Sequence, residues 1–200
     1  SPLIVSSLKI RDKLRERLAM PVEIGMRYGS PSTESGLQRL LAMGAKKIFL
    51  IPLYPHYAMS SYETAVVEAQ DVLRDIAPGV TLSIQPPFYD DEDYIDALVA
   101  QSAPFRSKDS DLLLFSYHGI PERHLRKSDP SHNYCLVDAN CCDKKNPAHA
   151  TCYRAQVYAT SRRFAEKAGL DREEWHLTFQ SRLGRDPWLK PYTDLELEAL

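Results

Sequence analysis

One short segment constrains the fold of this chain more than any other. Apolar residues fill positions 112–115, the run ends at His118, and Gly119 and Pro121 then favour a turn. A short apolar run with such boundaries is typical of a buried strand in a parallel sheet. Open α/β sheets bind ligands outside the carboxyl ends of their strands. The pattern therefore predicts that His118 lies at a ligand-binding edge.

The rest of the chain alternates between helical and strand patterns, which predicts an α/β fold of Rossmann-like parallel sheets with flanking helices. Ser30 is expected to cap a helix ahead of Pro31, and Ser60 to form a capping box with Glu63. Helices are predicted over residues 3–19, 30–43, 60–76, 92–102 and 150–168, and strands over 22–26, 47–53, 80–84 and 175–179. The prolines at 86 and 87 predict a boundary between domains over 1–87 and 88–200.

Composition narrows the function classes. The chain has 200 residues and is 44% hydrophobic, enough to bury a substantial core. Its 25 basic and 27 acidic residues are dispersed along the chain, and this argues against a nucleic-acid partner. No apolar run reaches the roughly 18 to 20 residues of a membrane-spanning helix, and the first residues lack the basic region of a secretion signal. A soluble, cytoplasmic protein is expected.

His118 suits a catalytic position by its chemistry. Imidazole titrates near neutrality and binds metal ions when it is neutral, so it serves as either a proton acceptor or a ligand. The alternative is a packing histidine with one ring nitrogen bonded to a backbone carbonyl. The strand pattern alone leaves both readings open.

All four cysteines lie in one predicted insertion, over about residues 122–152, with the spacing C-x5-C-C-x9-C. They are Cys135, Cys141, Cys142 and Cys152. In a cytosolic protein such a cluster is more often a metal site than a set of disulfides. Four thiolates match either a [2Fe-2S] cluster or a tetrahedral zinc ion. Adjacent cysteines project in different directions and suit two metal atoms better than one. The spacing therefore favours the cluster over zinc, free thiols or disulfides, and His132 and His149 are expected to be solvated loop residues.

Four segments resemble the ferrochelatase family, whose members insert ferrous iron into a porphyrin. They are residues 25–31 (GMRYGSP), 52–55 (PLYP), 116–121 (SYHGIP) and 178–194 (TFQSRLGRDPWLKPYTD). The segments occur in the family's order along most of the chain. The resemblance implies a chelatase fold, in which two similar Rossmann-like domains face each other across a porphyrin cleft. It also implies that this chain is the middle part of the family's length. On that view both domains are incomplete, and the family's catalytic glutamate has no counterpart among these residues.

The resemblance also implies roles for particular residues. His118 would be the proton acceptor or the ligand of the substrate iron, and the four cysteines would hold a [2Fe-2S] cluster, as in some microbial members with an internal insertion. Arg27, Tyr28 and Tyr54 would bind the porphyrin. The alternatives are an exposed helix cap or a surface ion pair for Arg27, and simple aromatic packing for Tyr54. His56 is expected to be a solvent-facing loop histidine.

The implied partners are a porphyrin, with protoporphyrin IX favoured over coproporphyrin, and ferrous iron. Peripheral contact with a lipid surface stays open because porphyrins are apolar, and the oligomeric state is unreadable. Two other functions stay open at this point. One is a non-catalytic fragment that binds an iron–sulfur cluster and a porphyrin, and the other is a related chelatase acting on another tetrapyrrole.

Overall fold

The structure, a computed structural model, describes residues 2–106 and 111–200. The chain divides into two compact units. The first unit comprises Ser1–Leu53 and Ser60–Pro86, and the second comprises Tyr54–Met59 and Pro87–Leu200. One division follows Pro86, the first of the two adjacent prolines, and the segment Tyr54–Met59 belongs to the second unit. The domains over 1–87 and 88–200 stay a prediction.

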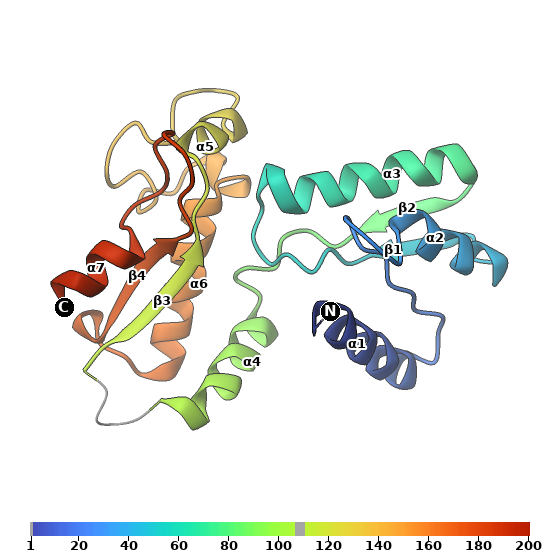
Figure 1. Cartoon of the computed structure of the whole chain (residues 1–200), viewed down its shortest axis with the longest axis horizontal. Coiled ribbons are helices and arrows are strands. Elements are labelled where there is room, and N and C mark those ends of the chain that lie inside the picture. Colours follow the sequence, from blue (N-terminus) through green and yellow to red (C-terminus); the bar gives the residue numbers. More distant parts are fainter. Residues whose placement is uncertain (1, 107–110) are drawn as a thin grey trace. The chain divides into compact units, whose positions relative to one another are not determined.

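The first unit is built on a pair of short parallel strands (Figure 1). Its elements are α1 (Pro2–Leu18), α2 (Thr33–Ala42), β1 (Lys47–Leu50), α3 (Thr64–Ile76) and β2 (Thr81–Ile84). Ile48 of β1 pairs with Leu82 of β2 in the parallel register. Leu37 of α2 and Leu73 of α3 pack with Ile48 to form the buried core of this unit. Apolar residues at helical spacing thus hold α2 and α3 against the strands.

Three local predictions for the first unit are wrong. Residues 22–26 do not form a strand, and Met26 makes only an isolated bridge with Ser32. Arginine side chains instead bond the carbonyl oxygens of this segment, with Arg15 Nε 2.8 Å from Val22 O. Two further differences concern caps. Ser32, not Ser30, caps α2 by accepting a bond from the Ser35 N–H at 3.1 Å, and a π-helical turn, Met59–Glu63, replaces the predicted capping box.

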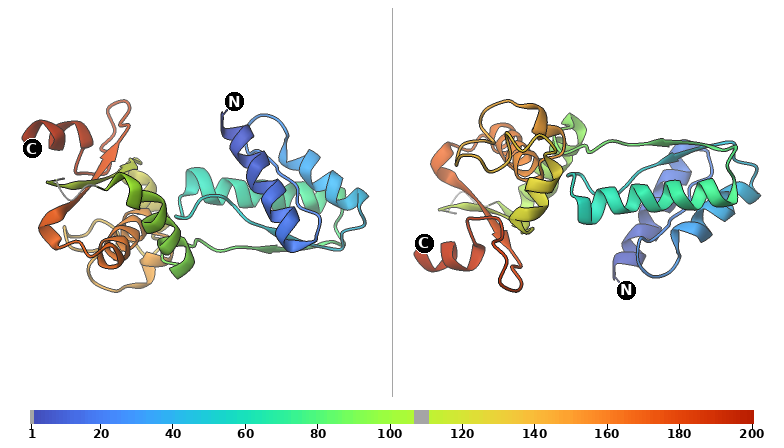
Figure 2. Two further views of the ribbon diagram at one scale, coloured as in Figure 1. Left: turned by 90° about the horizontal axis from the view of Figure 1, so that it is seen from below. Right: turned by 90° about the horizontal axis from the view of Figure 1, so that it is seen from above.

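The second unit is also built on two parallel strands with longer pairing. Its elements are α4 (Glu92–Ser102), β3 (Leu113–His118), α5 (Glu122–Ser128), α6 (Tyr153–Ala168), β4 (Trp175–Gln180) and α7 (Thr193–Ala199). β3 and β4 pair in register from Leu113 opposite Trp175 to His118 opposite Gln180. Both views of Figure 2 show α6 and α7 on opposite sides of this strand pair. The predicted α/β class with parallel strands and flanking helices is confirmed.

The side chains of β4 alternate between two sides, so that this one strand contacts both the buried core and α7. Leu177 and Phe179 are each 2% exposed and belong to the core that includes α6 residues. The intervening residues bond to α7. His176 Nε2 lies 2.8 Å from Glu196 Oε2, and Thr178 Oγ1 accepts a bond of 2.8 Å from Thr193. Successive side chains of a strand point to opposite faces, so this period-two pattern fixes the register.

Among the residues described, none of the helices has both the length and the apolar character needed to cross a lipid bilayer.

Candidate active site

His118 is the last residue of β3 and is exposed at the carboxyl end of the strand pair, as the sequence predicts. Its backbone position is fixed from β4, because the Gly119 N–H donates a 2.7 Å hydrogen bond to the Gln180 carbonyl. The carbonyl of His118 accepts a 2.9 Å bond from the Tyr153 hydroxyl. Both bonds are made by the peptide group between His118 and Gly119, which is therefore held by β4 on its N–H and by α6 on its carbonyl.

One nitrogen of the His118 imidazole is hydrogen-bonded, and the other has no hydrogen-bond partner among the described residues. Nδ1 lies 2.6 Å from the carbonyl oxygen of Gly119. A carbonyl oxygen only accepts hydrogen bonds, so Nδ1 carries the proton in this contact. In the neutral ring, Nε2 then carries a lone pair and can accept a proton or bind a metal ion. The bond to a backbone carbonyl is the one expected of a packing histidine, but here it orients an exposed ring.

Gly119 is required by the close approach of chain segments at this site. A Cβ atom at this position would lie 3.1 Å from the Gln180 carbonyl oxygen and 3.4 Å from Cε3 of Trp188. Trp188 is half-buried and anchored by a 2.8 Å bond from its Nε1 to the Leu183 carbonyl. Its ring centroid is 6.4 Å from that of His118. Trp188 is thus a packing anchor beside the histidine.

His56 is buried, contrary to the prediction of a solvent-facing loop histidine. Its Nε2 lies 2.9 Å from Oγ1 of Thr160 in α6. Its ring meets Tyr117 and Tyr153 edge-on, with centroid distances of 5.5 and 5.9 Å. Burial lowers the pKa of His56 to about 4, since charging the ring would require a desolvated cation. Neutral His56 therefore packs against Tyr117, which precedes His118 in β3, and against Tyr153, which bonds to the His118 carbonyl.

Tyr117 and Tyr153 retain their hydroxyl protons as a result of burial. It raises the pKa of Tyr153 to about 12 and that of Tyr117 further. The Tyr117 hydroxyl lies 3.0 Å from Ser161 Oγ in α6. Both tyrosines are hydrogen-bond partners to neighbouring groups and not proton acceptors near neutral pH.

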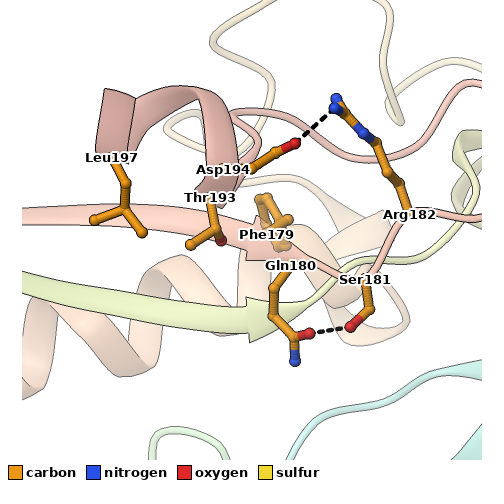
Figure 3. Close-up of a pocket in the computed structure, with 7 residues that line it drawn as sticks. All are labelled: Phe179, Gln180, Ser181, Arg182, Thr193, Asp194 and Leu197. Atoms are coloured by element: carbon orange, nitrogen blue, oxygen red, sulfur yellow. Dashed lines mark hydrogen bonds and ion pairs between the residues drawn. The ribbon is translucent and has the colours of Figure 1, made fainter. Parts of the chain in front are cut away.

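A pocket of about 490 Å3 lies at the end of β4, next to the strand position that pairs with His118. Figure 3 shows side chains from β4, the following loop and α7 around it. Its lining residues are Phe179, Gln180, Ser181, Arg182, Thr193, Asp194 and Leu197. Arg182 is paired with Asp194 at 2.7 Å and lies over the Tyr192 ring at 4.4 Å. The pocket therefore has a polar wall with its charges already balanced.

The predicted porphyrin-binding residues belong to different units. Arg27 and Tyr28 are in the first unit, where the guanidinium lies 4.5 Å from the centroid of the exposed Tyr28 ring. Arg27 also forms an ion pair with Glu68 of α3. Its Nε atom is buried and, among the described residues, has no hydrogen-bond partner. Tyr54 is in the second unit, at the start of the segment that carries His56, and is 37% exposed.

The four cysteines come together in the core of the second unit. All are free thiols with 3 to 7% of their surface exposed. Cys152 caps α6, its sulfur accepting a bond of 3.5 Å from the Ala155 N–H. The neighbouring side chains of Cys135 and Cys142, as hydrogen-bonding partners, lower the pKa of the Cys152 thiol. The pKa values of the Cys135 and Cys142 thiols are raised by the same contacts.

This donor set fits an iron–sulfur site in number and chemical softness. In the described parts of the chain, no group of three or more Cys, His, Asp or Glu residues is arranged to hold a metal ion. His149 lies alongside, with Nε2 3.3 Å from the Cys141 carbonyl oxygen, and is half-buried. His132 is exposed, as predicted.

Asp129, which the sequence reasoning missed, organises the start of the cysteine-bearing segment. Its carboxylate is 2% exposed and accepts bonds of 2.9 Å from the N–H groups of Tyr134 and Cys135. Ser131 donates two more, from its hydroxyl at 2.6 Å and from its N–H at 3.2 Å. These bonds, led by that of the Ser131 hydroxyl, lower the Asp129 pKa to about 2. The sequence Asp-Pro-Ser at 129–131 carries a turn signal that predicts such a carboxylate.

Comparison with known proteins decides the family. A family model described as ferrochelatase matches residues 1–200. The chain belongs to the ferrochelatase family. Curated proteins named ferrochelatase from Opitutus terrae, Pseudomonas fluorescens and Stutzerimonas stutzeri are 50%, 47% and 46% identical to it. Each match covers 100% of this chain and 59% of the relative. The chain thus spans about three fifths of the length of these ferrochelatases.

A solved structure supports the fold of this ferrochelatase-family chain. The structure described as SirB from Bacillus subtilis with Fe3+ superposes with a TM-score of 0.65, covering 96% of this chain and 63% of that one. The two sequences are 16% identical, so the similarity concerns the fold alone. The predicted chelatase fold is confirmed.

Proposed function

We propose that the protein inserts ferrous iron into a porphyrin in haem biosynthesis, with protoporphyrin IX as the substrate. Family membership supports this activity, and the geometry of His118 carries its chemistry. The bond from Nδ1 to the Gly119 carbonyl leaves Nε2 free on an exposed ring at the end of β3. That single observation distinguishes a reactive histidine from one committed to packing on both nitrogens.

Iron insertion requires two changes that an imidazole can assist. Two pyrrole protons leave the macrocycle, and the iron exchanges its own ligands for the four porphyrin nitrogens. Nε2 of His118 would accept a pyrrole proton or bind the incoming iron, and either role uses the same lone pair. The hydrogen-bonded peptide between His118 and Gly119 would limit the reorganisation needed as the proton moves.

Arg27, Tyr28 and Tyr54 would bind the porphyrin. The chemistry of the Arg27 guanidinium supports a role in binding a propionate, since guanidinium suits carboxylate with paired N–H donors. Glu68 would hold that guanidinium until substrate arrives. Tyr28 and Tyr54 both expose aromatic surface that could stack on an apolar macrocycle. The predicted domain 1–87 would contribute mainly porphyrin contacts, and 88–200 would contribute His118 and the cysteines.

We infer further that Cys135, Cys141, Cys142 and Cys152 hold a [2Fe-2S] cluster. Their burial in one core supports this, because four cysteines are the ligand set of such a cluster. When bound, the cluster would cross-link the chain at four points between α5 and α6. Unpaired cysteines also favour a reducing compartment, and we therefore propose a cytoplasmic protein. Peripheral contact with a lipid surface would suit an apolar product.

The test is anaerobic iron insertion by the full-length protein, followed through porphyrin fluorescence. His118→Ala is expected to lower kcat by at least about 100-fold, because general acid–base groups contribute on this scale. His124→Ala is the matched control, a half-buried histidine of the adjacent α5 that should leave turnover within twofold. Retained turnover in His118→Ala would remove this residue from the mechanism.

The alternative of a non-catalytic binding protein is separated by measuring two quantities on one sample. Fluorescence quenching reports porphyrin binding, and metallation reports catalysis. Binding without metallation by the full-length protein would favour the alternative. Visible absorption of protein purified without oxygen tests the cluster: broad bands between roughly 320 and 550 nm that bleach on reduction are expected. Cys142→Ser should abolish them.

A further inference from the structure

The first turn of α6 links the cysteines to His118. Cys152 is the cap of α6, and the next residue, Tyr153, is the first residue of the helix. The Cys152 side chain lies with Cys135 and Cys142 in one buried cluster, so its position depends on the arrangement of all three. The Tyr153 hydroxyl reaches the His118 carbonyl at 2.9 Å. A cysteine of this group and the residue that contacts the His118 backbone are thus adjacent in the sequence.

The ring of Tyr153 has little freedom to absorb a movement of Cys152. On one side it meets the edge of buried His56, which is itself tied to Thr160 of the same helix. The segment before Cys152 is also tied to α6. Gln156 is 1% exposed, and its Nε2 donates bonds of 3.1 and 3.0 Å to the carbonyl oxygens of His149 and Ala150. A displacement of the helix start therefore moves the Tyr153 hydroxyl relative to β3.

The His118 carbonyl matters because the adjoining peptide orients the imidazole. Nδ1 bonds to the carbonyl of Gly119, the very next residue, while the Gly119 N–H bonds to Gln180. Rotation of the peptide between His118 and Gly119 would alter both contacts. The Tyr153 bond fixes the one group of this peptide that β4 leaves unbonded.

We propose that Tyr153 is a positioning residue through which the state of the four cysteines sets the orientation of the His118 imidazole. The proposal deepens the proposed function and rests on it for its catalytic consequence. A change in what the sulfurs bind moves Cys152, Tyr153 transmits the movement, and His118 Nε2 is redirected. The cysteine-bearing segment is thereby a control element for iron insertion.

The first arm of the test compares two tyrosines of α6 in the full-length protein. Tyr153→Phe removes only the hydroxyl, and Tyr158→Phe is the control, a half-buried tyrosine that packs with Arg154 and Arg162. Tyr153→Phe should lower kcat about fivefold to tenfold, the range of one net hydrogen bond, with the porphyrin KM within twofold. It should also shift the His118 imidazole resonance in the NMR spectrum, assigned with His118→Ala. Tyr158→Phe should change none of these.

The second arm asks whether the cysteines act through this hydroxyl. Cys142→Ser, or an iron chelator applied to the purified protein, should shift the His118 resonance in the wild-type background. The same perturbations should shift it several-fold less in the Tyr153→Phe background. Equal shifts in both backgrounds, or an unmoved resonance in Tyr153→Phe, would overturn the proposal. A wild-type protein that inserts no iron would instead contradict the proposed function, and the NMR comparison would still decide the role of Tyr153.

Discussion

The two strand pairs of this chain are similar in topology and different in support. β1–β2 and β3–β4 are both parallel, yet the first pair spans four positions and the second spans six. Among the described residues, the buried cluster of the first unit consists of Leu37, Ile48 and Leu73. That of the second unit draws on α5, α6, β4 and all four cysteines. β1 leaves Phe49 58% exposed, whereas β4 buries three aromatic or aliphatic side chains.

This difference extends to the candidate site residues that each unit carries. In the second unit, two hydrogen bonds fix the peptide group that follows His118. In the first unit, the contacts found for Arg27 are side-chain contacts to Glu68 and Tyr28. Backbone contacts hold a group to one geometry, while an exposed ring and an ion pair can adapt to a ligand. We therefore propose that the better-packed unit supplies the catalytic residue and the other unit supplies adaptable substrate contacts.

The largest expected effect comes from truncating one core residue in each unit. Leu177→Ala, in β4, should lower the free energy of unfolding by about 2–5 kcal/mol through the lost burial and the cavity it leaves. Both tryptophans, Trp175 and Trp188, lie in the second unit, so their fluorescence during urea unfolding reports on that unit. Leu73→Ala, its counterpart in α3, should leave this transition nearly unchanged. An equal shift in both variants would mean that the units unfold together.

Asp129→Asn should produce the next largest loss in the free energy of unfolding. The amide keeps one acceptor oxygen but turns an N–H group toward donors that the carboxylate satisfied, at a cost of about 1–3 kcal/mol. Hydrogen exchange at the amides of Tyr134 and Cys135 should accelerate at least tenfold. Asp138→Asn, an exposed carboxylate in the same segment bonded to Lys144, is the control and should have little effect. Unchanged exchange in Asp129→Asn would show that other contacts order the segment.

Asp129 also gives this segment a defined response to acid. Its pKa is depressed from 3.8 to about 2 in the folded chain. The stabilisation is therefore present above pH 4 and is lost as the pH falls toward 2. The difference between wild type and Asp129→Asn should narrow over that interval, as measured by urea unfolding at each pH.

The buried His56 should give the folded chain a second pH dependence of stability, at higher pH than that of Asp129. Its folded pKa of about 4 lies below the ordinary 6.5, so the unfolded chain binds a proton that the folded chain excludes. Stability is then full above pH 6.5 and declines as the pH falls toward 4. Between pH 7 and 4.5, the free energy of unfolding of the wild type should fall by about 2 kcal/mol more than that of His56→Gln. The glutamine retains a hydrogen-bond partner for Thr160 but does not titrate. Parallel losses in the two proteins would contradict a buried neutral imidazole.

The sequence predicted those features whose causes are local. The predicted helix over 92–102 has the same bounds as α4, because an Asp91 cap and apolar periodicity both act within a few residues. The position of His118 at a strand end followed from the apolar run and the Gly and Pro after it. Each signal lies inside the element that it specifies.

The features that the sequence did not predict depend on distant partners. Residues 22–26 have a strand-like pattern, but a strand also needs a neighbour with which to pair. The burial of His56 depends on Thr160, and the contact of Tyr153 with His118 spans 35 positions. Asp129 is the exception, since its turn signal was readable. The candidate site depends on contacts between residues that are far apart in the sequence, and a single sequence does not show such contacts directly.

The smallest expected effect tests whether Arg27 is a substrate contact or a structural one. Glu68→Gln removes the carboxylate that pairs with Arg27, and a partly exposed ion pair contributes only up to about 1 kcal/mol to stability. If the guanidinium binds a propionate, losing this competitor should lower the porphyrin KM about twofold to threefold while kcat is maintained. Asp71→Asn is the control, a carboxylate of the same helix that pairs with exposed Arg74. An unchanged or higher KM in Glu68→Gln would assign Arg27 to holding α3, and the adaptable contacts of the first unit would then rest on Tyr28.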